Sequence, residues 1–278
     1  MGEGAANPVI TLTTDFGLAD PYVAAMKGVI LALNPRAVIV DVSHEVRPQR
    51  LLQAAFITQS AWPFFPGDAV HVAVVDPGVG TERRALALVT PRGRFLGPDN
   101  GVLSAALPDE ARPPPDQGLA LVPLPAGYRA FAITNRRLLR EPVSATFHGR
   151  DVFAPAAAHL SLGLRPEELG EPVEAMLTFP PLRARRDPDG VLRAQVVHID
   201  RFGNVVTDVR AEDLPEGPFT VELAGQLVPG PVRTYAEATG LAALVGSSGY
   251  LEVALPNGSA GEALGVDIGD AVVVRAGR

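Results

Sequence analysis

The chain has 278 residues, a length that suits two domains better than one, and 47% of its residues are apolar, enough for a sizeable core. It contains no cysteine, which excludes disulfides, thiolate metal sites and a cysteine nucleophile. The net charge of −7 gives no basic surface for nucleic acid, and no stretch approaches the ~18 apolar residues of a membrane helix. The N-terminus lacks signal-peptide features, so we expect a cytoplasmic protein that binds neither nucleic acid nor a membrane.

The first half of the chain alternates short apolar strands with amphipathic helices. A helix is expected to begin at Asp20-Pro21, with Asp20 as N-cap and Pro21 as first helical residue. A second helix is expected over residues 48–61. This alternation is typical of an α/β domain, because parallel strands need such crossovers. The strands expected in this half are 9–13, 37–42, 70–75, 85–90 and 130–134; a loop is expected at 97–101, short helices at 102–106 and 152–162, and an irregular segment at 107–128.

The composition changes near Leu164. Residues 164–192 are rich in Pro, Glu and Arg, and we interpret them as a linker between an N-terminal domain (1–163) and a C-terminal domain (193–278). The sequence thus predicts an α/β sandwich-type domain with a mainly parallel central sheet, followed by a small all-β domain that is a barrel or a sandwich. The alternating strands expected in the second domain are 193–200, 204–209, 218–224, 249–255 and 271–276.

Two of the expected strands end in an aspartate that is followed by glycine, at Asp15 and at Asp76. Ligands of open α/β sheets bind at the carboxyl ends of strands, where an aspartate can accept hydrogen bonds from both ribose hydroxyls. Each aspartate could instead cap its own turn. Residues 76–80 also resemble the first motif of S-adenosylmethionine (SAM) methyltransferases, but Glu82 occupies the third glycine position. Phosphate-loop patterns are absent, which favours a nucleoside without phosphates.

Further candidate residues lie in polar loops. His148 precedes a helix pattern and could act as a base or be an ordinary loop histidine. No histidine pair has metal-ligand spacing, so we expect no metal. In the second domain, Phe202 could stack on a flat base that Asn204 hydrogen-bonds, or both could belong to a β-hairpin turn. Ser247 and Ser248 would suit a carboxylate, but serine is also common in loops.

Together, the motifs of this chain resemble those of the SAM hydroxide adenosyltransferases, which are SAM hydrolases related to fluorinase and chlorinase. The resemblance spans almost the whole chain and is poor in 107–128 and in the linker. It implies an α/β N-terminal domain, an all-β barrel as C-terminal domain, and a homotrimer. SAM would lie between the N-terminal domain of one subunit and the C-terminal domain of the next. The seven matching segments are TTDFG at 13–17, DVSHEV at 41–46, VVDPGVGTERR at 74–84, GPDNGVL at 97–103, TFHGRD at 146–151, DRFGN at 200–204 and SSGYLEVA at 247–254.

The same resemblance implies that Asp76, Arg83 and His148 are the catalytic residues. In the halogenating relatives the aspartate position resembles a tyrosine and the histidine position differs, so Asp76 and His148 favour water over halide. Tyr22 and Ser248 stand where those relatives have a serine and an arginine that contact methionine. The substrate contacts implied are Asp15 to the ribose diol with Phe147 beside it, Asp200 to the methionine ammonium, Ser247 and Ser248 near its carboxylate, and Phe202, Asn204 and Asn257 facing adenine.

The expected reaction is in-line attack of water on C5′ of SAM, which gives adenosine and L-methionine. Arg83 would hold and polarise the water, while Asp76 and His148 orient it and one of them accepts its proton. The sequence leaves open which of the two does so. SAM is the substrate and no cofactor is expected. The alternatives are a SAM-dependent halogenase, a methyltransferase, or a protein that binds SAM or adenosine without turnover.

Overall fold

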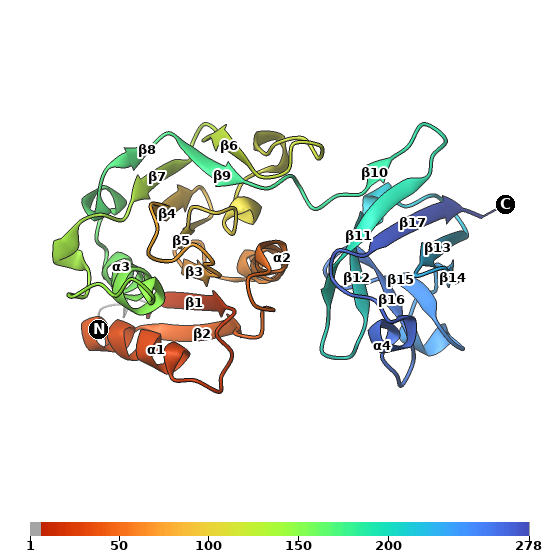
Figure 1. Cartoon of the computed structure of the whole chain (residues 1–278), viewed down its shortest axis with the longest axis horizontal. Coiled ribbons are helices and arrows are strands. Elements are labelled where there is room, and N and C mark those ends of the chain that lie inside the picture. The colour runs from red at the N-terminus through yellow and green to blue at the C-terminus, as the bar shows by residue number, and fades with distance from the viewer. Residues whose placement is uncertain (1–6, 278) are drawn as a thin grey trace, which may run out of the picture. The chain divides into compact units, whose positions relative to one another are not determined.

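The computed structural model describes residues 7–277, which form two compact units, one ending at Pro181 and one beginning at Leu182. Figure 1 shows both units, and each is described here by itself. The division falls inside the segment 164–192. Part of that segment pairs with strands of the first unit, and the linker boundaries drawn from composition stay a prediction.

The first unit is built on a seven-stranded sheet with the order β2-β1-β3-β5-β4-β7-β8. The pairs β2-β1, β1-β3 and β3-β5 are parallel, whereas β4, β7 and β8 add antiparallel pairs. A separate two-stranded sheet joins β6 and β9. The elements are α1 (Tyr22–Leu33), α2 (Leu51–Ala61), α3 (Ala154–Ser161), β1 (Val9–Thr14), β2 (Val38–Ser43), β3 (Val70–Val74), β4 (Ala85–Thr90), β5 (Gly93–Pro98), β6 (Ala120–Pro123), β7 (Arg129–Ala132), β8 (Pro172–Val173) and β9 (Ala175–Thr178).

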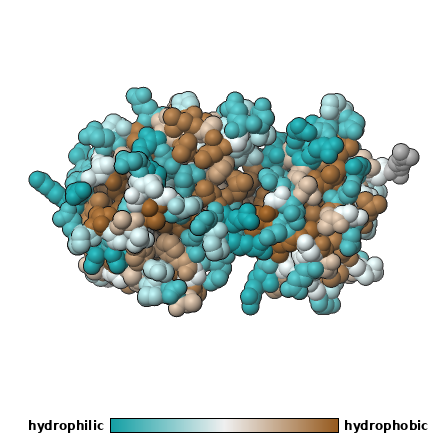
Figure 2. All heavy atoms as spheres, viewed as in Figure 1, coloured by the Kyte–Doolittle hydropathy of each residue, from teal (hydrophilic) through white to brown (hydrophobic). Residues whose placement is uncertain are grey.

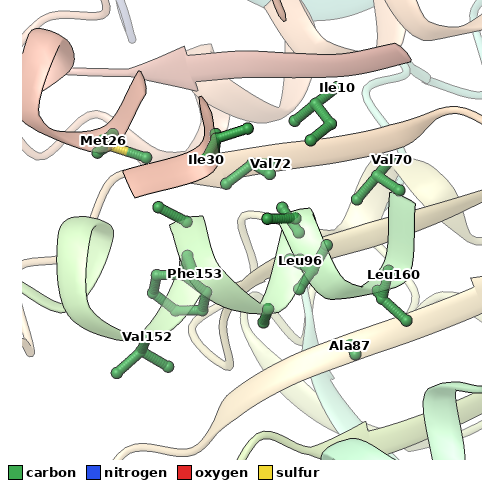
Figure 3. Packing of buried hydrophobic residues seen from close by; sticks show 14 of the residues in the cluster. Ile10, Met26, Ile30, Val70, Val72, Ala87, Leu96, Val152, Phe153 and Leu160 are labelled. Atoms are coloured by element: carbon green, nitrogen blue, oxygen red, sulfur yellow. The ribbon is translucent and has the colours of Figure 1, made fainter. Parts of the chain in front are cut away.

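Helices cover both faces of this sheet because successive side chains of a strand point to opposite faces. On β3, Val72 and Val74 belong to the cluster that includes α1 and α3, and Figure 3 shows Met26, Ile30, Phe153 and neighbouring residues packed there. Ala73, on the opposite face of β3, packs with Ala54 of α2 instead. The predicted α/β sandwich is therefore confirmed, and its sheet is mixed, with parallel pairing along β2-β1-β3-β5 and antiparallel pairing along β5-β4-β7-β8.

Several local expectations in the first unit are wrong. Helix α1 begins one residue later than expected, with Pro21 rather than Asp20 at the N-cap position and no side-chain capping bond. The helix expected at 102–106 is only a 3₁₀ turn, Ser104–Ala106. Gly97 and Pro98 were assigned to a loop, but they end strand β5. Glycine suits that strand because a Cβ at Gly97 would lie 2.6 Å from the carbonyl oxygen of Ala73.

The second unit is an antiparallel sheet that curls into a barrel, with the order β14-β13-β17-β11-β12-β16-β15 and β10 paired to β11. Its end strands approach each other, since the Val232 N–H donates to the Ala243 carbonyl at 3.0 Å beyond β14. The predicted all-β barrel is confirmed, and sequence patterning missed β10, β14 and β15. The elements are β10 (Arg185–Arg186), β11 (Leu192–Ile199), β12 (Val205–Arg210), β13 (Phe219–Leu223), β14 (Gln226–Gly230), β15 (Ala242–Val245), β16 (Tyr250–Ala254), α4 (Ala260–Leu264) and β17 (Ala271–Ala276).

The surface of the first unit exposes some large apolar side chains. Figure 2 shows apolar residues gathered over β6 and β9, and Leu119 and Leu121 in this region are 42% and 62% exposed. An exposed apolar patch of this kind is typical of a contact surface. Across residues 7–277, no helix has the length and apolarity needed to cross a bilayer.

Candidate active site

Three charged or polar side chains of the first unit meet where β3 ends. Asp76 follows β3, Arg83 precedes β4, and His148 precedes a π-helical turn, Gly149–Phe153. Arg83 Nε donates to Asp76 Oδ1 at 3.0 Å and Arg83 Nη2 donates to Asp76 Oδ2. The same Nη2 lies 2.7 Å from His148 Nδ1. The sequence-predicted catalytic set is thus one connected group, with the Arg83 and Asp76 side chains 10% and 5% exposed.

The contact between Arg83 and His148 fixes the state of the imidazole ring. A guanidinium only donates hydrogen bonds, so His148 Nδ1 must accept here. The neutral ring then carries its proton on Nε2. Burial and the positive charge of Arg83 both lower the pKa of His148 below its ordinary value, which keeps the ring neutral near pH 7. His148 therefore offers a donor at Nε2, while its acceptor is already used.

Glycine brings the two loops of this group together. Gly80 has φ +77°, and a Cβ there would lie 2.3 Å from the Ala145 carbonyl oxygen, so only glycine allows the approach. On the other loop, buried Asp151 accepts from the Ser144 N–H at 2.9 Å and from the Arg150 guanidinium. These contacts fix the segment that carries His148.

A cavity of about 270 Å³ lies beside this group. It is lined by Asp15, Asp76, Phe147 and His148, all predicted from sequence. Asp15 accepts the Gln49 N–H at 2.9 Å. Burial raises the pKa of Asp15, as does the nearby charge of Asp76, whereas the Gln49 bond lowers it.

An aromatic cluster forms one wall of the first-unit cavity. The rings of Phe16 and Phe147 line it and lie 5.9 Å apart. Tyr22, noted from sequence for its departure from the halogenase pattern, packs against both, at 5.8 Å from Phe16 and 5.2 Å from Phe147. These flat surfaces suit a planar or cationic ligand.

The second unit has its own cavity, of about 720 Å³. Asp200, Phe202, Asn204, Ser247 and Asn257 all line it. Ser248 is not among its lining residues, and the buried Ser248 Oγ has no hydrogen-bond partner within residues 7–277. The structure thus gathers the predicted site residues of each unit at one cavity, except that Ser248 lines neither cavity and Arg83 reaches the first one only through its contacts with Asp76 and His148.

Asp200 also organises its own loop. Its Oδ1 accepts the N–H groups of Phe202 and Asn204 at 2.8 and 2.9 Å, and its Oδ2 accepts Asn204 Nδ2 at 2.9 Å. These hydrogen bonds confirm the turn-forming alternative for this loop, and base binding by Phe202 and Asn204 stays a prediction. Phe202, 79% exposed, stands on the turn as a free aromatic face.

Sequence reasoning missed two kinds of residue at these cavities. Gln49 lines the first cavity and has φ 66°, an uncommon angle for a non-glycine residue. Tyr235 and Glu252 line the second cavity. Glu252 lay inside the SSGYLEVA segment, where an acid in an otherwise apolar strand was the available signal. Among the described residues, no group of three His, Asp or Glu is placed to hold a metal ion.

Comparison with known families covers both units. Residues 10–170 match the SAM hydroxide adenosyltransferase N-terminal domain, and residues 194–273 match the C-terminal domain of the same family. The chain belongs to the SAM hydroxide adenosyltransferase family. The resemblance found in the sequence motifs is confirmed.

Similar proteins of this family include an (R)-S-adenosyl-L-methionine hydrolase from Thermus thermophilus, 46% identical over 94% of this chain and 97% of that protein. One of the same name from Salinispora tropica is 40% identical, over 98% and 100%. A fluorinase from Actinoplanes is more distant, at 28% over 82% and 80%. A crystal structure of a conserved protein from Thermotoga maritima has a TM-score of 0.82 and 30% identity, covering 95% of this chain and 99% of that one.

Proposed function

We propose that this protein is an enzyme that hydrolyses SAM to adenosine and L-methionine. The observation that carries the proposal is the Asp76–Arg83–His148 group beside a cavity that also holds Asp15. Family membership and relatives named (R)-S-adenosyl-L-methionine hydrolase at 40–46% identity support it. No cofactor is needed, because SAM supplies its own leaving group.

The reaction is an in-line displacement at C5′. Water oxygen forms a bond to C5′ while the C5′–S bond breaks, and its electron pair returns to sulfur, which leaves as neutral thioether methionine. The leaving group needs no acid, so the enzyme has to position one water and remove its proton. Arg83 polarises this water, and His148 Nε2–H orients it by donating to its oxygen. Because His148 Nδ1 is already an acceptor, we assign the proton to Asp76.

The remaining residues bind the substrate under this proposal. Asp15 accepts the ribose hydroxyls and Phe147 packs beside the sugar. The second-unit cavity takes adenine and the methionine end of SAM. The contacts there are Phe202, Asn204 and Asn257 for adenine, Asp200 for the ammonium and Ser247 for the carboxylate, with Ser248 as a weaker candidate.

We also propose that the active unit is a homotrimer in the cytoplasm. Each unit of the chain has a cavity lined by part of the proposed substrate contacts, which suits a site completed by assembly. The exposed apolar residues near β6 suit a subunit contact. Light scattering of the purified protein should give three times the chain mass, and a monomer that hydrolyses SAM would contradict this assembly.

The test of the reaction uses purified protein, SAM, halide-free buffer and ¹⁸O-labelled water, with products followed by mass spectrometry. Adenosine labelled at the 5′ oxygen, with an equal amount of methionine, is the expected result. Intact SAM that binds tightly would instead indicate a binding protein, and S-adenosylhomocysteine would indicate methyl transfer.

A halogenase is the second candidate, because fluorinases are relatives at 25–28% identity. Its assay is the same incubation with chloride or fluoride added. Formation of 5′-halo-5′-deoxyadenosine would support it. The charged Asp76 beside the cavity disfavours it, since a carboxylate repels a halide at close range.

A further inference from the structure

Glu252 occupies an unusual position on β16. Leu251 and Val253 point into the barrel core, so Glu252 points to the outer face of the sheet, yet it is only 7% exposed. Its register partners are Val206 on β12 and Leu244 on β15, which are both apolar and buried. The neighbouring strands therefore give this acid no positive charge, although buried carboxylates are normally paired with one.

Two contacts fix the carboxylate of Glu252 at the wall of the second-unit cavity, and a second acid lies near it. Tyr235 Oη donates to Oε2 at 3.0 Å. Oε1 packs on Gly246, where an added Cβ would lie 1.7 Å from it. Asp200, which lines the same cavity, is close enough that its charge raises the pKa of both Tyr235 and Glu252.

The charges of this cavity are unbalanced. Its described lining residues include two acids, Asp200 and Glu252, and neither lysine nor arginine. Burial raises the pKa of Glu252 and the charge of Asp200 raises it further, whereas the Tyr235 hydrogen bond lowers it, so ionised Glu252 is less stable here than in water. A ligand with a positive group close to both carboxylates removes this penalty.

We propose that Glu252 is a specificity-determining residue that binds the ammonium group of the substrate, together with Asp200. This inference rests on the proposed function, because SAM supplies the primary ammonium. Tyr235 positions the carboxylate of Glu252, and Gly246 leaves room for it. The site selects its substrate by positive charge at this end, and binding of the cation favours ionised Glu252.

A purely structural role makes a different prediction for Glu252→Gln. Glutamine has the same shape and its carbonyl accepts the Tyr235 hydrogen bond as well, so an anchor for Tyr235 would survive the change. Binding of an ammonium group by Glu252 would not survive the change, because glutamine carries no negative charge. The matched control is Glu222→Gln on β13, which removes the same charge from an exposed acid paired with Arg275.

The experiment measures Kd by calorimetry in the Asp76→Asn background, so that slow turnover leaves the ligand intact. The ligands are SAM, its decarboxylated form, its deaminated form and adenosine. We expect Glu252→Gln to raise the Kd of SAM and of decarboxylated SAM by roughly 10- to 100-fold, the range for a lost charged hydrogen bond. The Kd values of deaminated SAM and adenosine should change less than about twofold. Glu222→Gln should leave the Kd of all four ligands unchanged.

Equal weakening of the aminated and deaminated ligands, or no weakening at all, would overturn the proposal. If Glu252→Gln does not fold, Glu252→Asp and Tyr235→Phe replace it. Glu252→Asp keeps the charge and should keep the preference for aminated ligands. Tyr235→Phe removes the hydrogen bond that positions the carboxylate and should reduce that preference. Wild-type turnover of SAM is scored separately. A protein that binds SAM without hydrolysing it would refute the proposed function and still test Glu252.

Discussion

The buried acids of the two units are stabilised in different ways. In the first unit, Asp76 is paired with Arg83, and the burial of Asp151 is outweighed by its hydrogen bonds, first those from Arg150, which lower the pKa of its carboxyl. In the second unit, burial raises the pKa of Asp208 to about 6 and also raises that of Glu252. The hydrogen bonds to these two acids come from neutral groups, those of Gln195 and Tyr235.

This difference separates two tasks. A reacting water needs charges that are already fixed before substrate arrives, as in the Asp76–Arg83–His148 group. A cationic substrate is bound more selectively by acids that lack a cationic partner, and this is the role proposed for Glu252. Asp15 is the first-unit acid with a raised pKa, and it too lines a cavity. Asp208 lines neither of the two cavities, so its burial is a cost to stability.

The largest effect should come from breaking the pair in the first unit. Asp76→Asn removes the proposed proton acceptor and keeps its shape, so kcat for SAM hydrolysis should fall by about 10²–10⁴-fold, the range for a positioned base. The substrate KM should change little, because Asp76 acts on water. Asp68→Asn, an exposed acid just before β3, is the control and should be indistinguishable from wild type. Full kcat in Asp76→Asn would exclude Asp76 as the base.

The next effect concerns stability in the second unit. The pKa of Asp208 is raised in the folded state from 3.8 to about 6, so the folded state favours the protonated acid. The contribution of Asp208 to the free energy of unfolding is largest below pH 4 and is lost as the pH rises through 6. The loss is about 3 kcal/mol in total. Asp208→Asn should remove this loss and stabilise the unit at pH 8.

Amide exchange along β12 at pH 4 and pH 8 measures this change. The single tryptophan, Trp62, lies in the first unit, so its fluorescence during unfolding serves as an internal control for that unit. Glu216→Gln, an exposed acid of the second unit, is the matched variant. Equal pH dependence of β12 protection in wild type and in Asp208→Asn would show that burial does not raise the pKa of Asp208.

A smaller effect should follow when the two first-unit loops are pushed apart. Gly80→Ala places a methyl group 2.3 Å from the Ala145 carbonyl and keeps φ at an unfavourable +77°. We expect a loss of about 1–3 kcal/mol and a fall in kcat, because Asp76 and His148 separate. Gly163→Ala has φ +93° and open space, so it carries the dihedral strain without the clash. Similar kcat values for both variants would refute the role of Gly80.

Much of this molecule was predictable because its signals are local. Apolar runs that end in Asp15 and Asp76 gave the strand ends, and alternation over 193–209 gave the first barrel strands. Strand β5 was not predicted, and Gly97 and Pro98 at its end are typical of loops, whereas the close approach to Ala73 that requires glycine is a tertiary contact. The same applies to β6 and β9, which pair across 52 or more residues between Pro123 and Ala175.

The candidate site was predictable for a different reason. Its residues were grouped by resemblance to a family, because spacing alone does not bring Asp76 and His148 together. What the sequence could not show was which atoms meet. The acceptance of the Arg83 hydrogen bond by His148 Nδ1 is visible only in the structure, and it is the reason for proposing Asp76 as the proton acceptor, a choice that the sequence leaves open.

The smallest effect on kcat at neutral pH concerns the protonation state of His148, and it tests the mechanism most directly. Its pKa is lowered by burial and by Arg83, so the ring is neutral above that pKa and gains a proton at Nδ1 only below it. Protonation breaks the bond from Arg83, and kcat should therefore fall on an acid limb whose midpoint lies below 6.5. Between pH 7 and pH 8 the rate should hardly change.

Replacement of the histidine tests this directly. His148→Asn keeps an oxygen that can accept from Arg83 but cannot titrate, so its acid limb should shift to the lower pH at which the carboxylates protonate. His159→Asn on α3 is the matched control, because burial lowers the pKa of that histidine as well and it lies outside the cavity. An acid limb that stays in place in His148→Asn would assign it to a carboxylate. If the acid limb of wild-type kcat instead had its midpoint well above 6.5, His148 would be charged at neutral pH, and Arg83 could not then donate to it.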